Sequence, residues 1–266
     1  MKLIKSGHSS AANDMVVGIM DWRLWLRLGW YDVVARYRRS WVGPFWMLAT
    51  TVIFVVSLGA VYSILFKMSL RDYMPYVAIG TVTWSYISAV TSESLQTFVE
   101  AEVYIRQVHR SPIIYTLRVV WRNLIIFGNQ LIVAFLVAVV FGKFSLAHMP
   151  LVAIGLMFLF LQAVWISIFL GILGTRFRDL TQVVQNIMQV SFFVTPILWM
   201  PTSLGDNSWI ATINPFYHLI QLLRAPMLGQ NPEVFSYVFA SCFTLAGFVA
   251  AYFFYSKFRN RIVYWL

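Results

Sequence analysis

Acidic residues are scarce in this chain of 266 residues, which has ten Asp and Glu against 20 Lys and Arg. Charged residues of both signs make up only 11% of the sequence, whereas 60% is hydrophobic and the mean hydropathy is +0.72. The surface of a soluble domain carries far more charge than this. The composition therefore excludes a soluble globular protein and predicts an integral membrane protein.

Groups that perform covalent or metal chemistry are also missing. The one cysteine, Cys242, has no partner for an intrachain disulfide, and the four histidines lie far apart without metal-ligand spacing. No G-x-x-x-x-G-K-[ST] loop is present, so ATP is not bound in the P-loop manner. We therefore expect no metal, cofactor or catalytic residue on this chain.

Few acids fall inside apolar segments, where Glu93 is the single example. A carrier driven by protons or sodium needs a relay of such carboxylates, and a membrane-embedded glycan-lipid transferase needs them clustered at a membrane face. The sequence disfavours both classes. The first 20 residues also lack the apolar core of a signal peptide, so export of the N-terminus is not expected.

Long apolar runs are abundant, and their length matches helices that cross a hydrocarbon core of about 30 Å. The alternating runs of about ten residues that build a membrane barrel are absent. The sequence predicts an all-α membrane protein. Its six expected spans are residues 45–66, 75–98, 113–141, 149–174, 181–199 and 234–256.

Basic residues follow this arrangement of spans. With both termini on one side, 16 of the 20 Lys and Arg residues fall on that side, and only Lys67, Arg71, Lys143 and Arg224 fall on the other. The positive-inside rule then makes both termini cytoplasmic and the number of spans even. The net charge of +10 is explained by this asymmetry, without a nucleic-acid partner.

Residues 20–41 precede the first span and place aromatic and apolar side chains on one helical face, with Arg23, Arg27 and Arg38 on another. This pattern predicts a helix lying in the cytoplasmic interface. It can be a topology anchor only. Alternatively, Arg36, Arg38 and Arg39 at the membrane boundary receive the phosphates of a lipid substrate.

Residues 213–229 are apolar but do not read as a span. Asn214-Pro215 is typical of a helix start, and Ala225-Pro226 ends or kinks that helix after about ten residues, which cover half a bilayer. The sequence therefore predicts a re-entrant or surface-lying amphipathic helix on the outer side. Its polar stripe, free to face an exit path, comprises Asn214, His218, Gln221 and Arg224.

The second and fifth predicted spans, residues 75–98 and 181–199, each carry a stripe of polar side chains. Such stripes either bond to other helices or line a path for a hydroxyl-rich solute. Aromatic rings beside them suit the faces of sugar rings. The candidate channel-lining residues are Tyr62, Thr81, Trp84, Ser85, Ser88 and Ser92, together with Gln182, Gln185, Asn186 and Gln189.

Two cytoplasmic loops, residues 100–112 and 174–180, are candidate contacts for an energy-supplying subunit, although ordinary solvated loops would look the same. The order and spacing of these loops, the second of which reads "GTRFRDL" (174–180), and of three further motifs resemble a known family. The three motifs are "ARYRRSWVGPFW" (35–46), "TPILW" (195–199) and "NPFYHLIQLLRAPMLG" (214–229). The chain is similar to the membrane subunits of type-two ABC exporters for bacterial surface polysaccharides, of the O-antigen and capsule kind called Wzm and KpsM.

This resemblance implies one transmembrane domain over residues 1–266, with a cytoplasmic N-terminal region (1–44), six spans (45–256) and a cytoplasmic tail (257–266). It implies a homodimer in the bacterial inner membrane that binds two copies of a separate ABC ATPase, which holds the ATP and Mg²⁺. The substrate would be a glycan linked to undecaprenyl diphosphate. The residues leave capsule or teichoic acid export, drug export and a passive channel open.

The resemblance also implies roles for particular residues. The coupling residues would be Glu100, Glu102, Arg106, Arg110, Arg176, Arg178 and Asp179. The periplasmic gate would comprise Asn214, Pro215, Tyr217, His218, Gln221 and Arg224.

Overall fold

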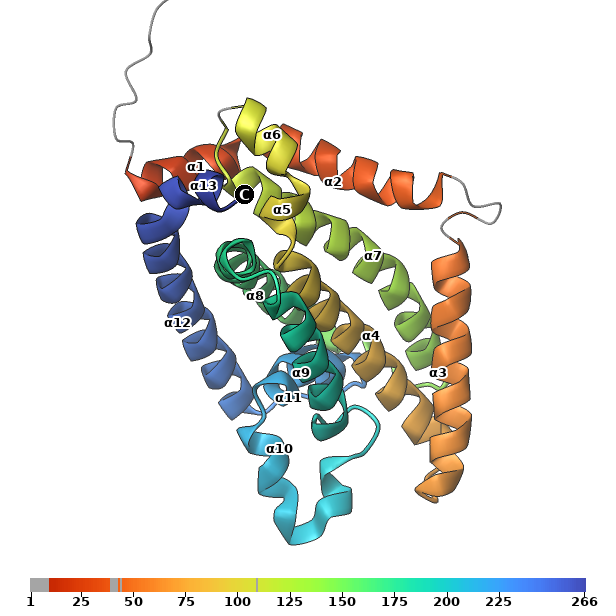
Figure 1. Cartoon of the computed structure of the whole chain (residues 1–266). Helices are drawn as coiled ribbons and strands as arrows, with labels where there is room; N and C mark the ends of the chain where they lie inside the picture. The colour runs from red at the N-terminus through yellow and green to blue at the C-terminus, as the bar shows by residue number, and fades with distance from the viewer. Residues whose placement is uncertain (1–9, 39–42, 44, 109) are drawn as a thin grey trace, which may run out of the picture.

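The protein is seen in a computed structural model that describes residues 10–38, 43, 45–108 and 110–266, and every regular element in these ranges is a helix (Figure 1). The α-helices are α1 (Ala11–Met20), α2 (Trp22–Tyr37), α3 (Phe45–Leu65), α4 (Leu70–Ser94), α5 (Thr97–Glu100), α6 (Glu102–Gln107), α7 (Ile113–Val140), α8 (Met149–Arg176), α9 (Leu180–Val194), α10 (Trp209–Ile213), α11 (Pro215–Met227), α12 (Val234–Phe258) and α13 (Ile262–Trp265). Three short 3-10 helices join them: η1 (Leu146–His148), η2 (Pro201–Ser208) and η3 (Arg259–Arg261). The predicted all-α class is confirmed for the described residues.

Four helical stretches of the described chain are long and apolar enough to cross a membrane: Phe45–Leu65, Ile113–Val140, Leu146–Arg176 and Val234–Trp265. They correspond to the first, third, fourth and sixth expected spans. The fifth, α9, has 15 residues and rises about 22 Å, which is shorter than the hydrocarbon core of about 30 Å. The six-span layout therefore stays a prediction.

The second expected span, α4, is long enough but less apolar, and its position explains why. It packs against α3, α7, α8, α9 and α11, and 16 of its 25 residues are buried. Helix interfaces inside a membrane accept small and hydroxyl side chains because these bond within the protein. The small and hydroxyl residues of α4 are therefore explained by its central position among the other helices.

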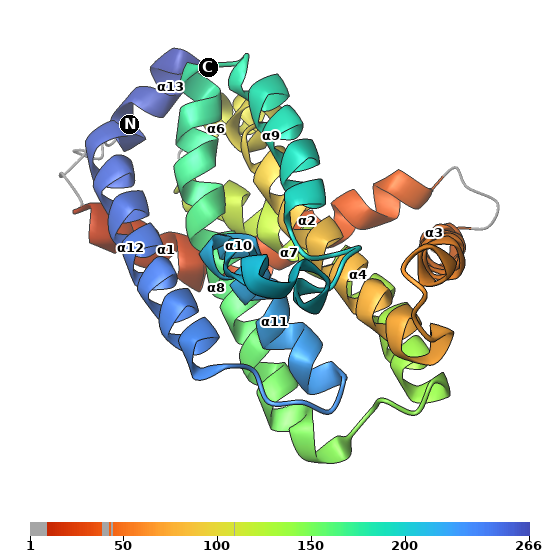
Figure 2. The same cartoon turned by 90° about the horizontal axis from the view of Figure 1, so that it is seen from below.

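Helices α3 and α12 stand at opposite edges of the molecule (Figures 1 and 2). α12 turns one narrow face toward α8, and that face consists of Ser236, Ala240, Thr244, Gly247, Ala251 and Tyr255, which are its buried residues. Their spacing of three and four residues places them in one stripe. The remaining faces of α12 are apolar and exposed, as expected of a helix bordering lipid or a second chain.

At one end of the molecule, α1 and α2 lie across the ends of the long helices (Figure 1). Val33 is buried, and Gly29 lets α2 approach α7 closely, since a Cβ there would lie 2.9 Å from the carbonyl oxygen of Arg118. This crossing orientation agrees with the interfacial helix expected over residues 20–41. Its position relative to a membrane remains a prediction.

Most of residues 213–229, the apolar segment that is not expected to span, fold as α11, near the end opposite α2 (Figure 1). Asn214 is its N-cap and accepts a hydrogen bond from the amide of Phe216 at 2.9 Å, and Pro215 occupies the first turn, as predicted. Pro226 does not end the helix, which continues to Met227. Its 13 residues rise about 20 Å, too short to cross a bilayer.

Candidate functional site

The two polar stripes face different surroundings. Every residue of the α9 stripe, Gln182, Gln185, Asn186 and Gln189, is exposed. On α4, Thr81 and Ser85 line a groove of about 320 Å³ shared with α3 and α7. The α9 stripe is therefore open on the surface of one chain, whereas Thr81 and Ser85 of the α4 stripe border α3 and α7.

The other candidate channel-lining residues of α4 are buried or half-buried. Trp84 is buried and packs against Phe192 of α9 and Phe216 of α11, with ring centroids 6.0 and 5.2 Å away. Ser88 and Ser92 are half-buried. Tyr62, on α3, is also half-buried and lies beside the ring of Phe66. Trp84 therefore links α9 to α11 as well as bordering the polar stripe.

The irregular segment after α9, residues 195–199, is held by side chains from other helices. The Tyr76 hydroxyl lies 3.0 Å from the carbonyl oxygens of both Pro196 and Trp199, and the Tyr73 hydroxyl donates to that of Leu198. Asn214 donates its amide to the Thr195 hydroxyl at 3.0 Å. The tyrosine hydroxyls satisfy backbone carbonyl groups that no helix can satisfy here, and the Asn214 bond holds the Thr195 side chain.

Arg224 completes this arrangement from α11. It donates to the carbonyl oxygen of Pro196 at 2.8 Å, and its guanidinium carbon lies 4.0 Å from the centroid of the Tyr76 ring. Gly80 makes room for it, since a Cβ there would lie 2.4 Å from a guanidinium nitrogen. Arg224 is 1% exposed. Its charge is thus held by a carbonyl dipole and an aromatic face.

The expectation that the polar stripe of α11 faces open space is wrong for His218 and Arg224, which are both buried. His218 Nε2 lies 2.8 Å from the carbonyl oxygen of Thr212 and must donate, so Nδ1 accepts from the Ser236 hydroxyl at 3.0 Å. Tyr217 is buried and Gln221 half-buried. Polar side chains on a tightly packed helix can hydrogen-bond to neighbouring segments. The periodicity of the sequence does not distinguish such a buried polar face from an exposed one.

Tyr76 provides a direct test of how the 195–199 segment is held. Replacing it with phenylalanine keeps the ring beneath Arg224 but removes the hydroxyl from two carbonyl oxygens. We expect Tyr76→Phe to lower the free energy of unfolding by about 1 kcal/mol, because the Trp199 carbonyl oxygen loses its donor while that of Pro196 keeps Arg224. The measurement is thermal unfolding of the purified protein in detergent.

The matched control is Tyr86→Phe on the same helix. Tyr86 is also buried, but its hydroxyl has no hydrogen-bond partner among the described residues. Removing that hydroxyl should leave the melting temperature unchanged or raise it. Equal losses in the two variants would show that the 195–199 segment is not held by Tyr76.

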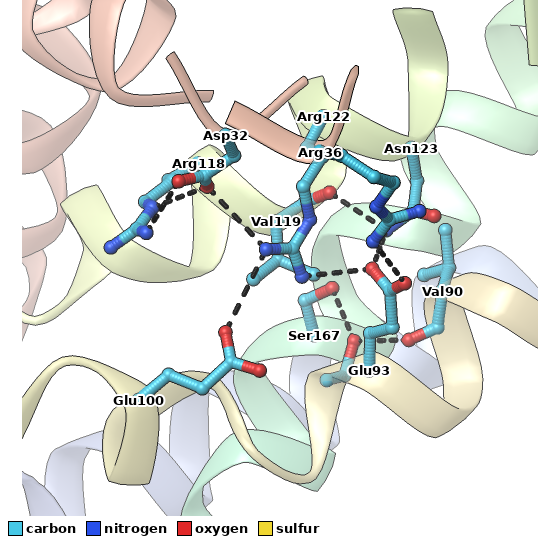
Figure 3. Close-up of polar contacts among 11 residues, drawn as sticks. Asp32, Arg36, Val90, Glu93, Glu100, Arg118, Val119, Arg122, Asn123 and Ser167 are labelled. Atoms are coloured by element: carbon cyan, nitrogen blue, oxygen red, sulfur yellow. Dashed lines mark hydrogen bonds and ion pairs between the residues drawn. The ribbon is translucent and has the colours of Figure 1, made fainter. Parts of the chain in front are cut away.

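A network of charged side chains joins α2, α4, α5 and α7 at the other end of the molecule (Figure 3). Arg118 binds Asp32 through two bonds of 2.6 Å. Arg122 lies between three carboxylates, at 2.8 Å from Glu93, 3.4 Å from Asp32 and 3.6 Å from Glu100. We call this set the charged junction; its remaining members are Arg36 and Asn123.

The charged junction changes the interpretation of the basic cluster before the first span. Arg36 lies 3.2 Å from Glu93 and is therefore committed to an ion pair, while Arg38 is exposed. Arg39 lies outside the described residues. The sequence pointed to Glu93 as the single acid in a span but gave no sign of its partners, which lie 29 to 57 positions away in the chain.

The two predicted coupling loops lie at the same end of the molecule, because α13 packs on both α6 and α8. Several of their charges are used inside the chain: Glu102 binds Arg106 at 2.9 Å, and Arg110 binds Asp21 at 2.9 Å. The exposed part of this surface is partly apolar. It includes Val103, Tyr104, Phe177, Arg176, Arg178 and Asp179.

The sequence profile of the ABC-2 type transporter family matches residues 23–228, which is most of the chain. The chain belongs to the ABC-2 type transporter family. The match includes α9, α11 and every member of the charged junction.

Curated relatives in this family share a specific description. An O-antigen export system permease protein RfbA from Klebsiella pneumoniae is 26% identical over 226 residues, covering 82% of this chain and 84% of the relative. A second one from the same species is 27% identical over 197 residues, 71% of this chain and 74% of the relative. RfbA from Myxococcus xanthus is 20% identical over 203 residues, 76% and 73% respectively.

Proposed function

We propose that this ABC-2 type transporter chain is the membrane subunit of an ATP-driven exporter for O antigen carried on undecaprenyl diphosphate, in the bacterial inner membrane. The observation that carries the proposal is the similarity to O-antigen export permeases over most of both chains. The exposed polar helix α9 and the loop surface at the α6 end agree with a conduit and a docking surface. ATP hydrolysis belongs to a separate ABC ATPase.

The separate polar stripes support a homodimer. In one chain, the α9 stripe is exposed and the α4 stripe faces α3 and α7, so neither encloses a path. A second copy placed against these helices would border one. In that arrangement α11 and the 195–199 segment form the periplasmic gate, and Tyr76 and Arg224 keep the gate in place rather than contact the glycan.

The experiment is removal of the chain from its host and complementation with the intact sequence. We expect cells without it to lose surface glycan and to accumulate full-length glycan on the lipid diphosphate, with surface display restored by complementation. Accumulation of truncated glycan would instead indicate a transferase. Accumulated capsule or teichoic acid precursor would assign the same architecture to that polymer, and export that persists without any ABC ATPase would indicate a channel.

Arg38 is the proposed diphosphate contact that the structure leaves exposed. Arg38→Gln should lower glycan display about tenfold at matched protein level, because a charge-assisted hydrogen bond contributes about 1.5 kcal/mol. The control is Arg23→Gln, which removes an exposed charge from the other end of α2. Equal display in the two variants, measured by surface-glycan labelling, would remove this role.

A further inference from the structure

A cavity of about 780 Å³ lies between the carboxyl-terminal ends of α8 and α12 and the short α13. Its walls are mainly apolar and aromatic: Phe253 is 66% exposed, while Phe254 packs its ring against Phe169 at 4.6 Å. The ends of α8 and α12 that border the cavity lie at the same end of the molecule as α1 and α13 (Figure 1). Of its lining residues, Arg176 and Phe177 also belong to the proposed coupling surface, whereas those of α12, η3 and α13 have no role in the export proposal.

Three cations stand among the lining residues: Arg176, Lys257 and Arg261. No acidic residue lines the cavity in the described part of the chain. Each of these cations lies near an aromatic ring. The guanidinium carbon of Arg176 is 5.1 Å from the centroid of the Trp265 ring, and the Lys257 Nζ and the Arg261 guanidinium carbon are 5.5 and 5.9 Å from that of Phe258. The cavity thus combines uncompensated positive charge with apolar walls.

Several carboxylates at this end of the molecule are paired with other groups. Asp14 bonds to Tyr255 and lies 4.0 Å from Arg259, and Glu102 binds Arg106. The carboxylates of the charged junction are bound by Arg36, Arg118 and Arg122. An anion from outside the chain would therefore meet three cations at a cavity that no carboxylate lines in the described part of the chain.

We propose that this cavity binds an anionic phospholipid of the surrounding leaflet, with its phosphate at Arg176, Lys257 and Arg261 and its acyl chains along Phe253 and Phe254. Basic pockets between membrane helices on the cytoplasmic side are suited to such headgroups. The apolar walls belong to Leu146–Arg176 and Val234–Trp265, two stretches able to cross a membrane. Acyl chains match these apolar walls, and a phosphate matches the three cations. This inference rests on the membrane placement in the proposed function.

The test is native mass spectrometry of the purified full chain titrated with phosphatidylglycerol and, as the neutral reference, phosphatidylcholine. Lys257→Gln combined with Arg261→Gln should weaken phosphatidylglycerol binding about 25-fold, since each surface cation contributes about fivefold. Arg176 is left intact because it is also a proposed coupling residue. Arg23→Gln combined with Arg27→Gln removes the same charge from α2 and should weaken binding less than threefold.

A second variant, Phe253→Gln, tests the apolar wall without changing charge. Phe253 is exposed, so this variant should fold normally and still bind phosphatidylglycerol several times more weakly. Equal weakening by the pocket and α2 variants, or none in either, would overturn the proposal. Displacement of phosphatidylglycerol by an equal concentration of a polyprenyl diphosphate would also overturn it. So would a Lys257/Arg261 variant that binds the lipid normally but no longer co-purifies with the ATPase. The assay needs neither ATP nor glycan, so failure of export leaves its result intact.

Discussion

Replacing Arg122 with methionine is expected to lower the free energy of unfolding by about 2–3 kcal/mol, because Glu93 loses its shorter ion pair and keeps only Arg36 and Asn123. The Arg122 side chain is 8% exposed and binds Glu93 at 2.8 Å, with Asp32 and Glu100 nearby. Methionine fills a similar volume, so the loss would report charge rather than packing. Thermal and denaturant unfolding in detergent measure it.

The control for this variant is Arg106→Met. Arg106 also binds a glutamate, at 2.9 Å, but both side chains are largely exposed. An exposed pair of this kind contributes at most about 1 kcal/mol. Arg122→Met as mild as Arg106→Met would show that the charged junction is not a structural connection between α2, α4 and α7. Adding Glu93→Gln to Arg122→Met should cost less than the sum of the two single changes, because both remove the same ion pair.

Gly174→Ala is expected to produce the second large effect, a loss of about 3 kcal/mol in the free energy of unfolding. A Cβ at Gly174 would lie 2.0 Å from the carbonyl oxygen of Leu95, so α8 would have to move away from the segment between α4 and α5. Backbone atoms cannot turn aside as a flexible side chain can, and overpacking in a tight core costs about 1–3 kcal/mol or more.

Gly128→Ala, on α7, is the matched control. An added Cβ there meets nothing within 4 Å, so the change should stabilise the helix by up to about 1 kcal/mol. Opposite shifts in melting temperature for these two glycines are the expected result. A stable Gly174→Ala variant would mean that α8 does not approach Leu95 as closely as described.

Several features follow from local sequence alone. The apolar runs predict the long helices α3, α7, α8 and α12 within a few residues, and Asn214-Pro215 predicts the start of α11. Both are decided by residues close together in the chain, through hydropathy and capping. Membrane orientation rests on the distribution of Lys and Arg and stays a prediction. Family membership was also recognisable from motif order.

The interpretation of individual polar residues was less successful, for a physical reason. His218 and Arg224 sit on the face that periodicity marks as polar, but α11 is enclosed by α4, α8 and α12, so that face bonds to protein. Arg36 stays a proposed phosphate ligand, and the structure adds an ion pair with Glu93 that the sequence did not indicate. A side chain's role depends on which helix packs beside it, and hydropathy does not encode that choice.

The sequence by itself determined that this chain is a helical membrane protein, where most of its helices begin, and which family it belongs to. Only the tertiary structure decided which charges are already paired. Arg122 meets Glu93 and Asp32 across 29 and 90 positions, and Arg176 comes to one cavity with Lys257 and Arg261. Charges so far apart in the chain meet only after helices pack, so the cations left free for a ligand cannot be counted before folding.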